Sequence, residues 1–284
     1  TPQNGISIVS NTNGVLTLTG TATLAQYTQA LRSVTFSSTS DDPTATSSTR
    51  TVSWQVRDAN SDNAGVATST AVTSTVTLTA VNDAPVLGGV LPSPTFTENG
   101  TAVVLDGGLT LSDLDDTQIA SASVRISSGL TAGDVLAFVN QSGISGSYDA
   151  ATGLLSLTGT ATLAQYQAAL RTITFGSSSD DPTANATATT RGITWTVTDA
   201  NSDGAGAGSG TRATSVTVVP AQDAPVLTAG GSSTYIENAP AQAIDATLAV
   251  VSDADDTHLS GATITISGGY NAGDVLGFTP QNRI

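Results

Sequence analysis

Apolar and polar residues alternate along several short stretches of this chain. Ala122, Val124 and Ile126 take every second position between polar neighbours, and the same period of two recurs over 51–56 and 192–197. Because successive strand side chains point to opposite faces, each stretch predicts a strand with one buried face. Gly, Asn and Asp separate these stretches at short intervals, which favours an antiparallel β-sandwich over a parallel sheet.

One stretch has the period of a helix instead. In "TATLAQYQAAL" at 160–170, Thr162 and Gln165 have the spacing of a capping box, and Leu163, Tyr166 and Leu170 fall on one helical face. The segment predicts a short helix, and its near copy at 21–31 predicts a second one.

The chain repeats itself with a period of about 140 residues. "LTGTATLAQY" occurs at 18–27 and at 157–166, and "DAPVL" occurs at 83–87 and at 223–227. We therefore expect an all-β fold of tandem sandwich repeats with one short helix in each. The expected domains are the later part of one repeat (1–83), a complete repeat (84–223) and the earlier part of the next (224–284).

Composition and charge narrow the possible partners. The net charge of −15 leaves no basic patch for nucleic acid, and it makes divalent cations natural partners. The chain has no cysteine and no apolar run long enough to span a membrane, so neither disulfides nor membrane insertion is predicted. It also has no methionine, so we expect it to be part of a longer polypeptide.

Acidic residues recur in register with the repeat. The only two glutamates, Glu98 and Glu237, lie in the matching motifs "TENG" and "IENA". Four motifs of this chain resemble those of the bacterial cadherin-like domains that recur in giant surface adhesins, including those of the repeats-in-toxin type. They are a Glu-Asn pair, a D-x-D loop, an aspartate that ends a late strand and an N-D-A-P exit. The residues that carry this resemblance are Glu98 with Asn99, Asp113 with Asp115, Asp58, Asp199, and 82–85.

This resemblance implies a cadherin-like or immunoglobulin-like sandwich with calcium at each junction between repeats. Calcium takes six to eight oxygen ligands, for which short Asp and longer Glu side chains are suited. At the first junction we expect ligands from Asn82, Asp83, Asp113, Asp115, Asp116 and Asp199. At the second we expect Glu98, Asp223, Asp253, Asp255 and Asp256. Gln222 replaces the linker Asn there, and no D-R-E motif is present, so fewer ions than the three of animal cadherins are expected.

The sequence is compatible with two classes of function and disfavours a third. The first is a calcium-stiffened extender of an extracellular, secreted or cell-surface adhesin, biofilm component or filament, and the alternative is a calcium-dependent lectin. An enzyme is not predicted, because one unrepeated histidine and no cysteine exclude the usual nucleophilic triads. Trp54 and Trp195 fall on the apolar phase of their strands, so we interpret them as core residues rather than sugar platforms.

The first and last segments predict a partner, which is the protein itself. Residues 1–83 contain later strands of a repeat and 224–284 contain earlier ones, so we expect the two to complete each other head to tail. Asp58 would then reach Asp253 and Asp255 of the preceding copy, and Glu237 of that copy would approach Asn82 and Asp83. Strand donation between chains and a slice of one long polypeptide are both compatible with this expectation.

Overall fold

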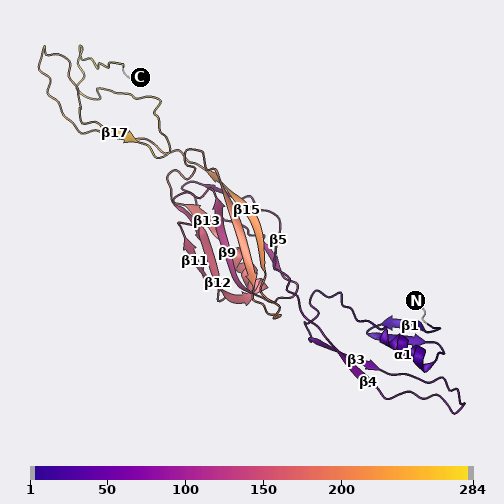
Figure 1. The fold of residues 1–284 in the computed structure, drawn as a ribbon. Coiled ribbons are helices and arrows are strands. Elements are labelled where there is room, and N and C mark those ends of the chain that lie inside the picture. Colours follow the sequence, from indigo (N-terminus) through magenta and orange to yellow (C-terminus); the bar gives the residue numbers. More distant parts are fainter. Residues whose placement is uncertain (1–3, 281–284) are drawn as a thin grey trace. The chain divides into compact units, whose positions relative to one another are not determined.

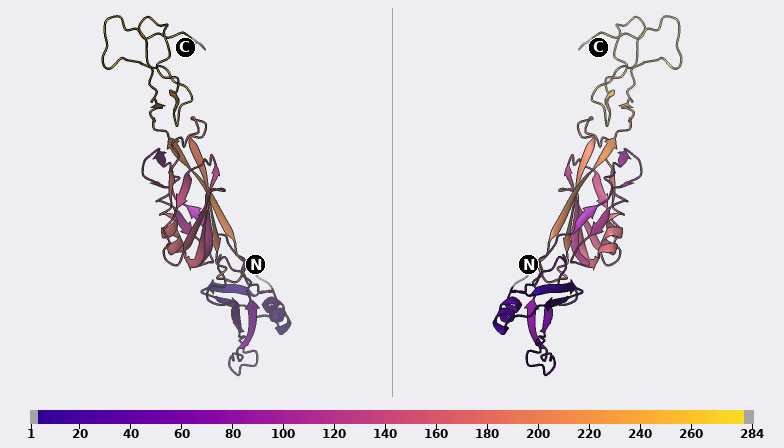
Figure 2. Two further views of the ribbon diagram at one scale, coloured as in Figure 1. Left: turned by 90° about the vertical axis from the view of Figure 1, so that its left-hand side faces the viewer. Right: turned by 90° about the vertical axis from the view of Figure 1, so that its right-hand side faces the viewer.

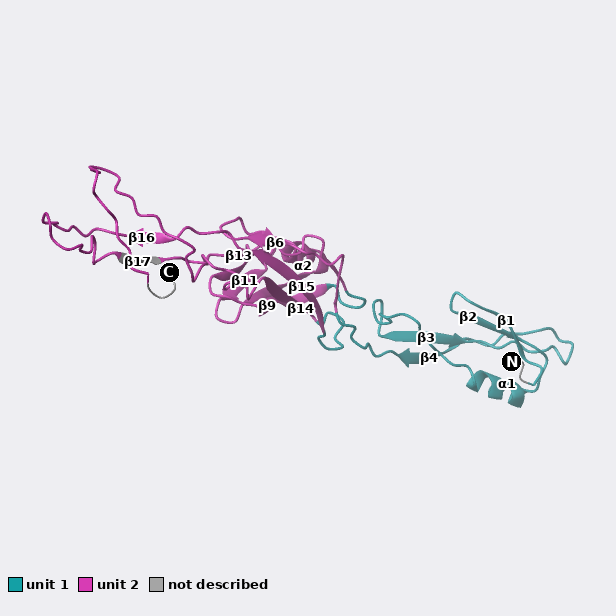
Figure 3. Cartoon of the chain, turned by 90° about the horizontal axis from the view of Figure 1, so that it is seen from above, with its two compact units in different colours: residues 1–84, 113–117, 201–208 teal, residues 85–112, 118–200, 209–284 magenta. Residues whose placement is uncertain are grey.

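The computed structural model describes residues 4–280, and the chain in it divides into two compact units (Figure 3). The first unit comprises residues 1–84, 113–117 and 201–208, and the second comprises 85–112, 118–200 and 209–284. The domain boundaries predicted at 83 and 223 remain predictions.

The second unit is built on a six-stranded sheet (Figure 1). Its strand order is β11-β12-β9-β14-β15-β6. The strands are β11 (Ser145–Asp149), β12 (Leu154–Thr162), β9 (Gln118–Ser128), β14 (Thr190–Asp199), β15 (Ser209–Val219) and β6 (Thr95–Thr97). The predicted alternation is confirmed, because Ala122, Val124 and Ile126 are buried on β9 and Ile193, Trp195 and Val197 are buried on β14.

Shorter strands form the opposing layer. A three-stranded sheet has the order β10-β13-β7, from β10 (Asp134–Ala137), β13 (Thr174–Ser177) and β7 (Val103–Val104). A separate pair joins β5 (Val86–Gly88) to β8 (Thr110–Ser112). Phe96 of the larger sheet meets Phe175 of the smaller one edge to face, with ring centroids 5.5 Å apart. The two layers therefore share one apolar core, as predicted for a β-sandwich.

One strand pair departs from the antiparallel prediction. β6 runs parallel to β15, with Thr95, Phe96 and Thr97 opposite Thr217, Val218 and Val219. All other strand pairs in the described residues are antiparallel. The parallel pair joins the first strand of the large sheet to its last one, so a long crossover through the whole repeat connects them.

The predicted helix is α2 (Leu163–Leu170), which packs beside the sheets with Tyr166, Ala169 and Leu170 buried in the core (Figure 2). Its capping box is present as predicted, since Thr162 and Gln165 each accept a hydrogen bond from the other's backbone N–H. The Tyr166 hydroxyl donates to the Gly159 carbonyl at 2.7 Å, which ties the helix to the end of β12.

The N-terminal residues of the first unit form two hairpins and a helix. β1 (Ser7–Thr12) pairs with β2 (Val15–Thr19), β3 (Thr49–Trp54) pairs with β4 (Val72–Thr77), and α1 (Leu24–Arg32) lies between the hairpins in sequence. Only Ile6 and Ala30 are buried among residues 4–83. The buried face expected for the third strand is therefore incomplete: Val52 and Trp54 are half-buried, and Val56 is 46% exposed.

The C-terminal residues contain one strand pair, β16 (Val226–Thr228) with β17 (Ala249–Ser252). No side chain described within residues 224–280 is buried. The hydrophobic core of the second unit is thus supplied by residues 96–218.

Candidate metal centre

The first acidic cluster is formed by the loop that follows β8. Asp113 Oδ1 accepts hydrogen bonds from the backbone N–H groups of Asp115 at 3.2 Å and Asp116 at 3.0 Å. This turn folds the D-L-D-D sequence back on itself. One carboxylate oxygen from each of the three aspartates consequently lies within 4.8 Å of the other two.

Two further segments of the first unit close around this loop. The Asp83 N–H of the linker donates to Asp115 Oδ2 at 2.8 Å, and the Asn82 amide donates to the Asp83 carbonyl at 2.9 Å. Ser202 donates both its backbone N–H and its hydroxyl to Asp116 Oδ1. The structure therefore brings Asp83 of the linker into contact with the D-x-D loop. That Asn82, Asp83 and this loop hold calcium stays a prediction.

The cluster has the properties of a cation site. Asp115 and Asp116 are 9% and 3% exposed, and three buried carboxylate oxygens have no hydrogen-bond donor: Asp113 Oδ2, Asp115 Oδ1 and Asp116 Oδ2. Burial, together with neighbouring Asp115, raises the pKa of Asp113 to about 6. Buried carboxylate oxygens without a donor are costly unless a cation neutralises them, so these residues fit a hard, oxygen-seeking ion such as calcium.

The second acidic cluster has the same turn but a different linker. Asp253 Oδ1 accepts from the N–H groups of Asp255 at 3.3 Å and Asp256 at 2.9 Å, and the Asp223 N–H donates to Asp255 Oδ2 at 3.2 Å. Gln222 donates its side-chain amide to Asp255 Oδ1 at 3.4 Å and to Asp256 Oδ2 at 3.3 Å. The glutamine side chain thus partly satisfies carboxylates that a cation would otherwise have to neutralise.

The second cluster is more open than the first, and two of its aspartates shift each other's pKa in opposite directions. Asp253 and Asp255 are joined by a side-chain hydrogen bond. This bond lowers the pKa of Asp253 and raises the pKa of Asp255. Asp223 Oδ2 is the only oxygen here that is buried without a donor among the described residues. Asp256 is exposed, in contrast to its equivalent Asp116.

The side chain of Glu98 contacts the second linker and is not part of the cluster of three aspartates. Its side chain is 3% exposed, and its Oε2 accepts from the Ala221 N–H at 2.8 Å while Oε1 has no donor. Ala221 directly precedes Gln222 and Asp223, so Glu98 reaches the second junction segment. It is not among the three residues whose oxygens lie within 4.8 Å of one another, which are Asp253, Asp255 and Asp256.

Asp199, Asp58 and Glu237 are not members of either group of three clustered aspartates. Asp199 is fully buried at the end of β14, in the unit of the sandwich. Asp58 accepts from the N–H groups of Asn60 at 3.1 Å and Ala67 at 3.0 Å, which makes it the anchor of its own loop. Glu237 is exposed in a turn. Their roles as ligands remain predictions.

Sequence reasoning missed Ser202 and Gln222. The repeated pentapeptide "DANSD" at 58–62 and 199–203 was a signal for Ser202. In the sequence, Gln222 is identifiable only as a replacement for the linker asparagine. Its longer side chain is what allows it to reach two aspartates of the following loop.

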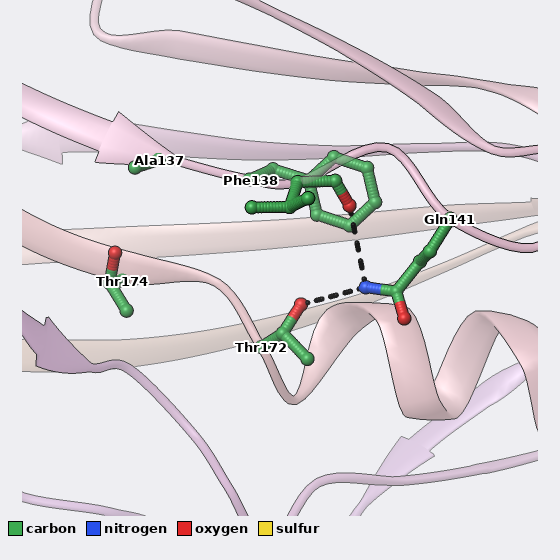
Figure 4. Close-up of a pocket in the computed structure, with 6 residues that line it drawn as sticks. Ala137, Phe138, Gln141, Thr172 and Thr174 are labelled. Atoms are coloured by element: carbon green, nitrogen blue, oxygen red, sulfur yellow. Dashed lines mark hydrogen bonds between the residues drawn. The ribbon is translucent and has the colours of Figure 1, made fainter.

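A surface hollow in the sandwich has a different character (Figure 4). It is lined by Ala137, Phe138, Val139, Gln141, Thr172 and Thr174, and the Gln141 amide donates to the Thr172 hydroxyl at 3.1 Å. These lining side chains include no carboxylate, imidazole or thiol. The hollow therefore offers none of the ionisable side chains usual in acid–base chemistry.

Comparison with known proteins gives local similarity. No protein-family model matches the chain. A segment of 97 residues is 38% identical to Halomucin of Haloquadratum walsbyi. The matched segment covers 32% of this chain and 1% of that protein.

Among solved structures, the chain is similar to Protocadherin Gamma C5 EC1-3, with a TM-score of 0.27, 13% identity, 84% of this chain and 63% of that chain covered. It is also similar to the extracellular cadherin domains 1-5 of Protocadherin Gamma B2, with a TM-score of 0.24, 11% identity and coverage of 62% and 26%. The chain thus spans less than two thirds of each of these proteins.

Within the part of the chain that the structure describes, neither helix has the length and apolar character needed to cross a bilayer.

Proposed function

We propose that the chain consists of calcium-stiffened structural repeats of an extracellular or cell-surface adhesin or fibre. The observation that carries the proposal is the set of three buried carboxylate oxygens without a donor on Asp113, Asp115 and Asp116. They lie beside the linker residues Asn82 and Asp83, so an ion held there would fix the linker against the loop. The structural role is therefore to control the angle between successive repeats.

The energetics of calcium binding suit this role. For extracellular sites with a Kd of about 10⁻⁴ to 10⁻³ M, calcium at about 10⁻² M adds roughly 1.4 to 2.7 kcal/mol per ion through mass action. That is comparable with a covalent staple in a chain that has no cysteine. Without the ion, the carboxylates repel one another at short range.

Two further observations support the extender over the other classes. The segment similar to Halomucin is 1% of that protein, so sequence of this kind occurs within a very long polypeptide. Trp195 is fully buried, with its indole N–H donating to Thr214 at 2.8 Å, so this ring does not offer the stacking surface a lectin needs. The acidic groups lie at linkers, which favours a structural role over carboxylate-based catalysis.

Calorimetric titration of the chain with calcium tests the site. We expect binding to the wild type and a loss of at least about tenfold in affinity at the first site for Asp115→Asn, because one buried anionic ligand is removed. Asp149→Asn is the matched control, since Asp149 only caps a hairpin through Ala151 and Thr152. Heat of binding that is absent, or equal in all three proteins, would contradict the calcium site.

Small-angle scattering tests the mechanical consequence. The maximum dimension should change when calcium is replaced by excess chelator, because the freed linkers sample more angles. Glu98→Ala should change the second junction only, since Glu98 contacts Ala221 rather than the 82–83 linker. Identical scattering with calcium and with chelator would show that the ion does not stiffen the chain.

A further inference from the structure

Three Asn-x-Ser/Thr tripeptides, in which x is not proline, lie in the chain. They are Asn99-Gly100-Thr101, Asn140-Gln141-Ser142 and Asn185-Ala186-Thr187. This tripeptide is the acceptor sequence for N-linked glycans in proteins that leave the cell. The asparagine and the hydroxyl residue of each tripeptide are exposed to solvent. Sequence and exposure alone therefore do not distinguish the three.

Glycan transfer needs two groups of the acceptor to be accessible. The asparagine Nδ2 forms the new bond, and the transferase must also recognise the hydroxyl two residues later. Within a folded chain, a group held by the protein's own hydrogen bonds becomes accessible only when its segment opens locally. The hydrogen bonds at each tripeptide therefore decide which of the three the folded protein offers.

The tripeptide at Asn185 is held closed. Asn185 Nδ2 donates to Asp181 Oδ2 at 3.1 Å, and the Asn185 backbone N–H donates to the same oxygen at 2.9 Å. The Thr187 hydroxyl donates to the Ala184 carbonyl at 2.6 Å. Both groups that a transferase must reach are therefore occupied.

The tripeptide at Asn140 is held by a tight hairpin turn. Asn140 Oδ1 accepts from the Gly146 N–H at 2.9 Å. The backbone N–H groups of Gln141 and Ile144 each donate to the other residue's carbonyl, at 3.1 Å and 2.7 Å, and Ser142 between them has a φ of 51°. A transferase would have to open this turn before it could bind the tripeptide.

The tripeptide at Asn99 is open. Among the described residues, none forms a hydrogen bond with the Asn99 side-chain amide or with the Thr101 hydroxyl. The Gly100 N–H donates to the Thr97 carbonyl at 2.9 Å, and in this turn Asn99 has a φ of 57°, which asparagine tolerates better than most residues. Asn99 thus offers both required groups in the folded protein.

We propose that Asn99 is an N-glycosylation site. In the reaction, Asn99 Nδ2 attacks the anomeric carbon of an oligosaccharide that is linked to a lipid phosphate. The new carbon–nitrogen bond replaces the carbon–oxygen bond to the phosphate, the lipid phosphate leaves, and the amide nitrogen loses one proton. The sugar donor and the transferase come from the cell that exports the protein. The proposal shares only the extracellular location with the proposed function, because no calcium ion takes part.

The glycan would stand beside the second linker. The Glu98 N–H donates to the Val219 carbonyl at 2.9 Å, and Glu98 Oε2 accepts from the Ala221 N–H at 2.8 Å. Asn99 is the next residue along the chain. A polar oligosaccharide attached to it would therefore cover the end of the sandwich from which this linker leaves.

The matching turn of the following repeat provides an internal control. Asn238 has a φ of 64°, and the Ala239 N–H donates to the Ile236 carbonyl at 3.0 Å, as in the turn at Asn99. Pro240 stands two residues after Asn238, so the acceptor tripeptide is absent there. Asn238 should therefore stay unmodified, and Pro240→Thr should make it an acceptor.

Glycan transfer onto the purified chain tests the proposal. The 284-residue protein, made in a host without N-glycosylation, is incubated with a lipid-linked oligosaccharide and a single-subunit transferase that needs only the tripeptide. Peptide mass spectrometry then gives the occupancy of each asparagine over time. Asn99 should react at least about tenfold faster than Asn185, because Asn185 reacts only when its loop opens.

An unfolded reference shows whether the fold causes this difference. Trypsin cleaves after Arg125 and Arg171, so each of the three tripeptides lies on a separate tryptic peptide. These peptides keep the sequences but lose the hydrogen bonds, so the difference in rate between Asn99 and Asn185 should largely disappear. A difference of the same size in the peptides would overturn the assignment to the folded turn.

Variants separate the proposal from the calcium site. Thr101→Ala should abolish transfer to Asn99, and Asp181→Ala should raise transfer to Asn185 by releasing its side chain. Asp115→Asn, which removes a candidate calcium ligand, should leave the rate at Asn99 unchanged. A failed calcium site would therefore leave this proposal standing.

Two results would overturn the proposal directly. One is a folded chain in which Asn99 is not modified or reacts no faster than Asn185. The other comes from protein purified from the cells that produce it, in which the same mass measurement should find a glycan on Asn99. An unmodified Asn99 in that material would show that the site is not used.

Discussion

The helices α1 and α2 have nearly the same sequence and the same local contacts, but they differ in burial. Thr23 and Gln26 cap α1 as Thr162 and Gln165 cap α2, and Tyr27 donates to Gly20 at 2.6 Å as Tyr166 donates to Gly159 at 2.7 Å. In α2 the buried residues are Tyr166, Ala169 and Leu170, whereas in α1 only Ala30 is buried. The local sequence therefore forms the helix and its cap, and only the complementary strands bury it.

The same lesson applies to the tryptophans. Trp54 and Trp195 each donate an indole N–H to a hydroxyl of the paired strand, at 2.9 Å and 2.8 Å. Trp195 is fully buried and Trp54 is half-buried. A strand pair can thus form the indole hydrogen bond without the second layer that buries the ring.

The largest expected effect is a difference in the free energy of unfolding between variants of the two tryptophans. Trp195→Ala should lower the free energy of unfolding by about 3–5 kcal/mol, because it leaves a cavity in a closed core. Trp54→Ala should cost less than about 1 kcal/mol in dilute solution, where its site is partly open. Urea denaturation followed by circular dichroism measures both losses. This signal comes from the backbone, so it does not depend on which tryptophan remains. Equal losses would mean that the N-terminal segment has a closed core of its own.

A smaller effect is expected from the caps, and here the two helices should agree. Thr162→Ala and Thr23→Ala each remove a hydrogen bond to a helix N-terminal N–H, at a cost of about 1 kcal/mol of helix stability. Amide hydrogen exchange of residues 163–170 and 24–32 reports each helix separately. Thr28→Ala is a control within α1, because its hydroxyl bonds only to the Leu24 carbonyl and leaves the cap intact. A loss of protection in one helix alone would show that the capping boxes are not equivalent.

The pH dependence of calcium affinity distinguishes the two acidic clusters. Asp113 has a pKa raised to about 6, chiefly by burial. The pKa of this carboxyl is higher in the folded than in the unfolded chain. Its ionised form therefore destabilises the ion-free folded protein at neutral pH, and this cost is relieved as the pH falls through about 6. Calcium needs the ionised form, so affinity at the first cluster should fall by about tenfold between pH 7 and pH 5.

Calorimetric calcium titrations at the two pH values measure this change. Asp113→Asn should remove most of the pH dependence, because it removes the titrating group at the first cluster. An affinity that rises towards pH 5 would contradict the assigned direction.

Sequence alone predicted the strands, the helix and the acidic loops well, because each has a local signal. The period of two over 121–126 and 192–197 and the capping spacing of Thr162 and Gln165 act within a few residues. The parallel pairing of β6 with β15 was not predicted, because no pattern in Thr95–Thr97 specifies which distant strand it meets. The pairing of Asp134 with Arg191 was missed for the same reason, since 57 residues separate them.

The candidate site shows the same division. The D-x-D turn around Asp113 could be predicted from its residues, and the linker contact of Asp83 followed from the resemblance to cadherin-like repeats. Ser202 and Gln222 could not be assigned, because their roles depend on which loop reaches which carboxylate. Glu98 was expected beside Asp223, Asp253 and Asp255. Its side chain instead bonds to Ala221 of the linker, and it is not among the three clustered aspartates.

The parallel pair of β6 and β15 determines how a repeat bears a load. Tension along the polypeptide would pull β6 by its amino end and β15 by its carboxyl end, in opposite directions along strands that lie side by side. The Thr217–Pro94 and Glu98–Val219 backbone hydrogen bonds, at 3.0 Å and 2.9 Å, would then be sheared together rather than opened one after another. Rupture under force follows the unfolding rate rather than the equilibrium stability. A repeat of modest thermodynamic stability would therefore resist stretching through the geometry of its first and last strands.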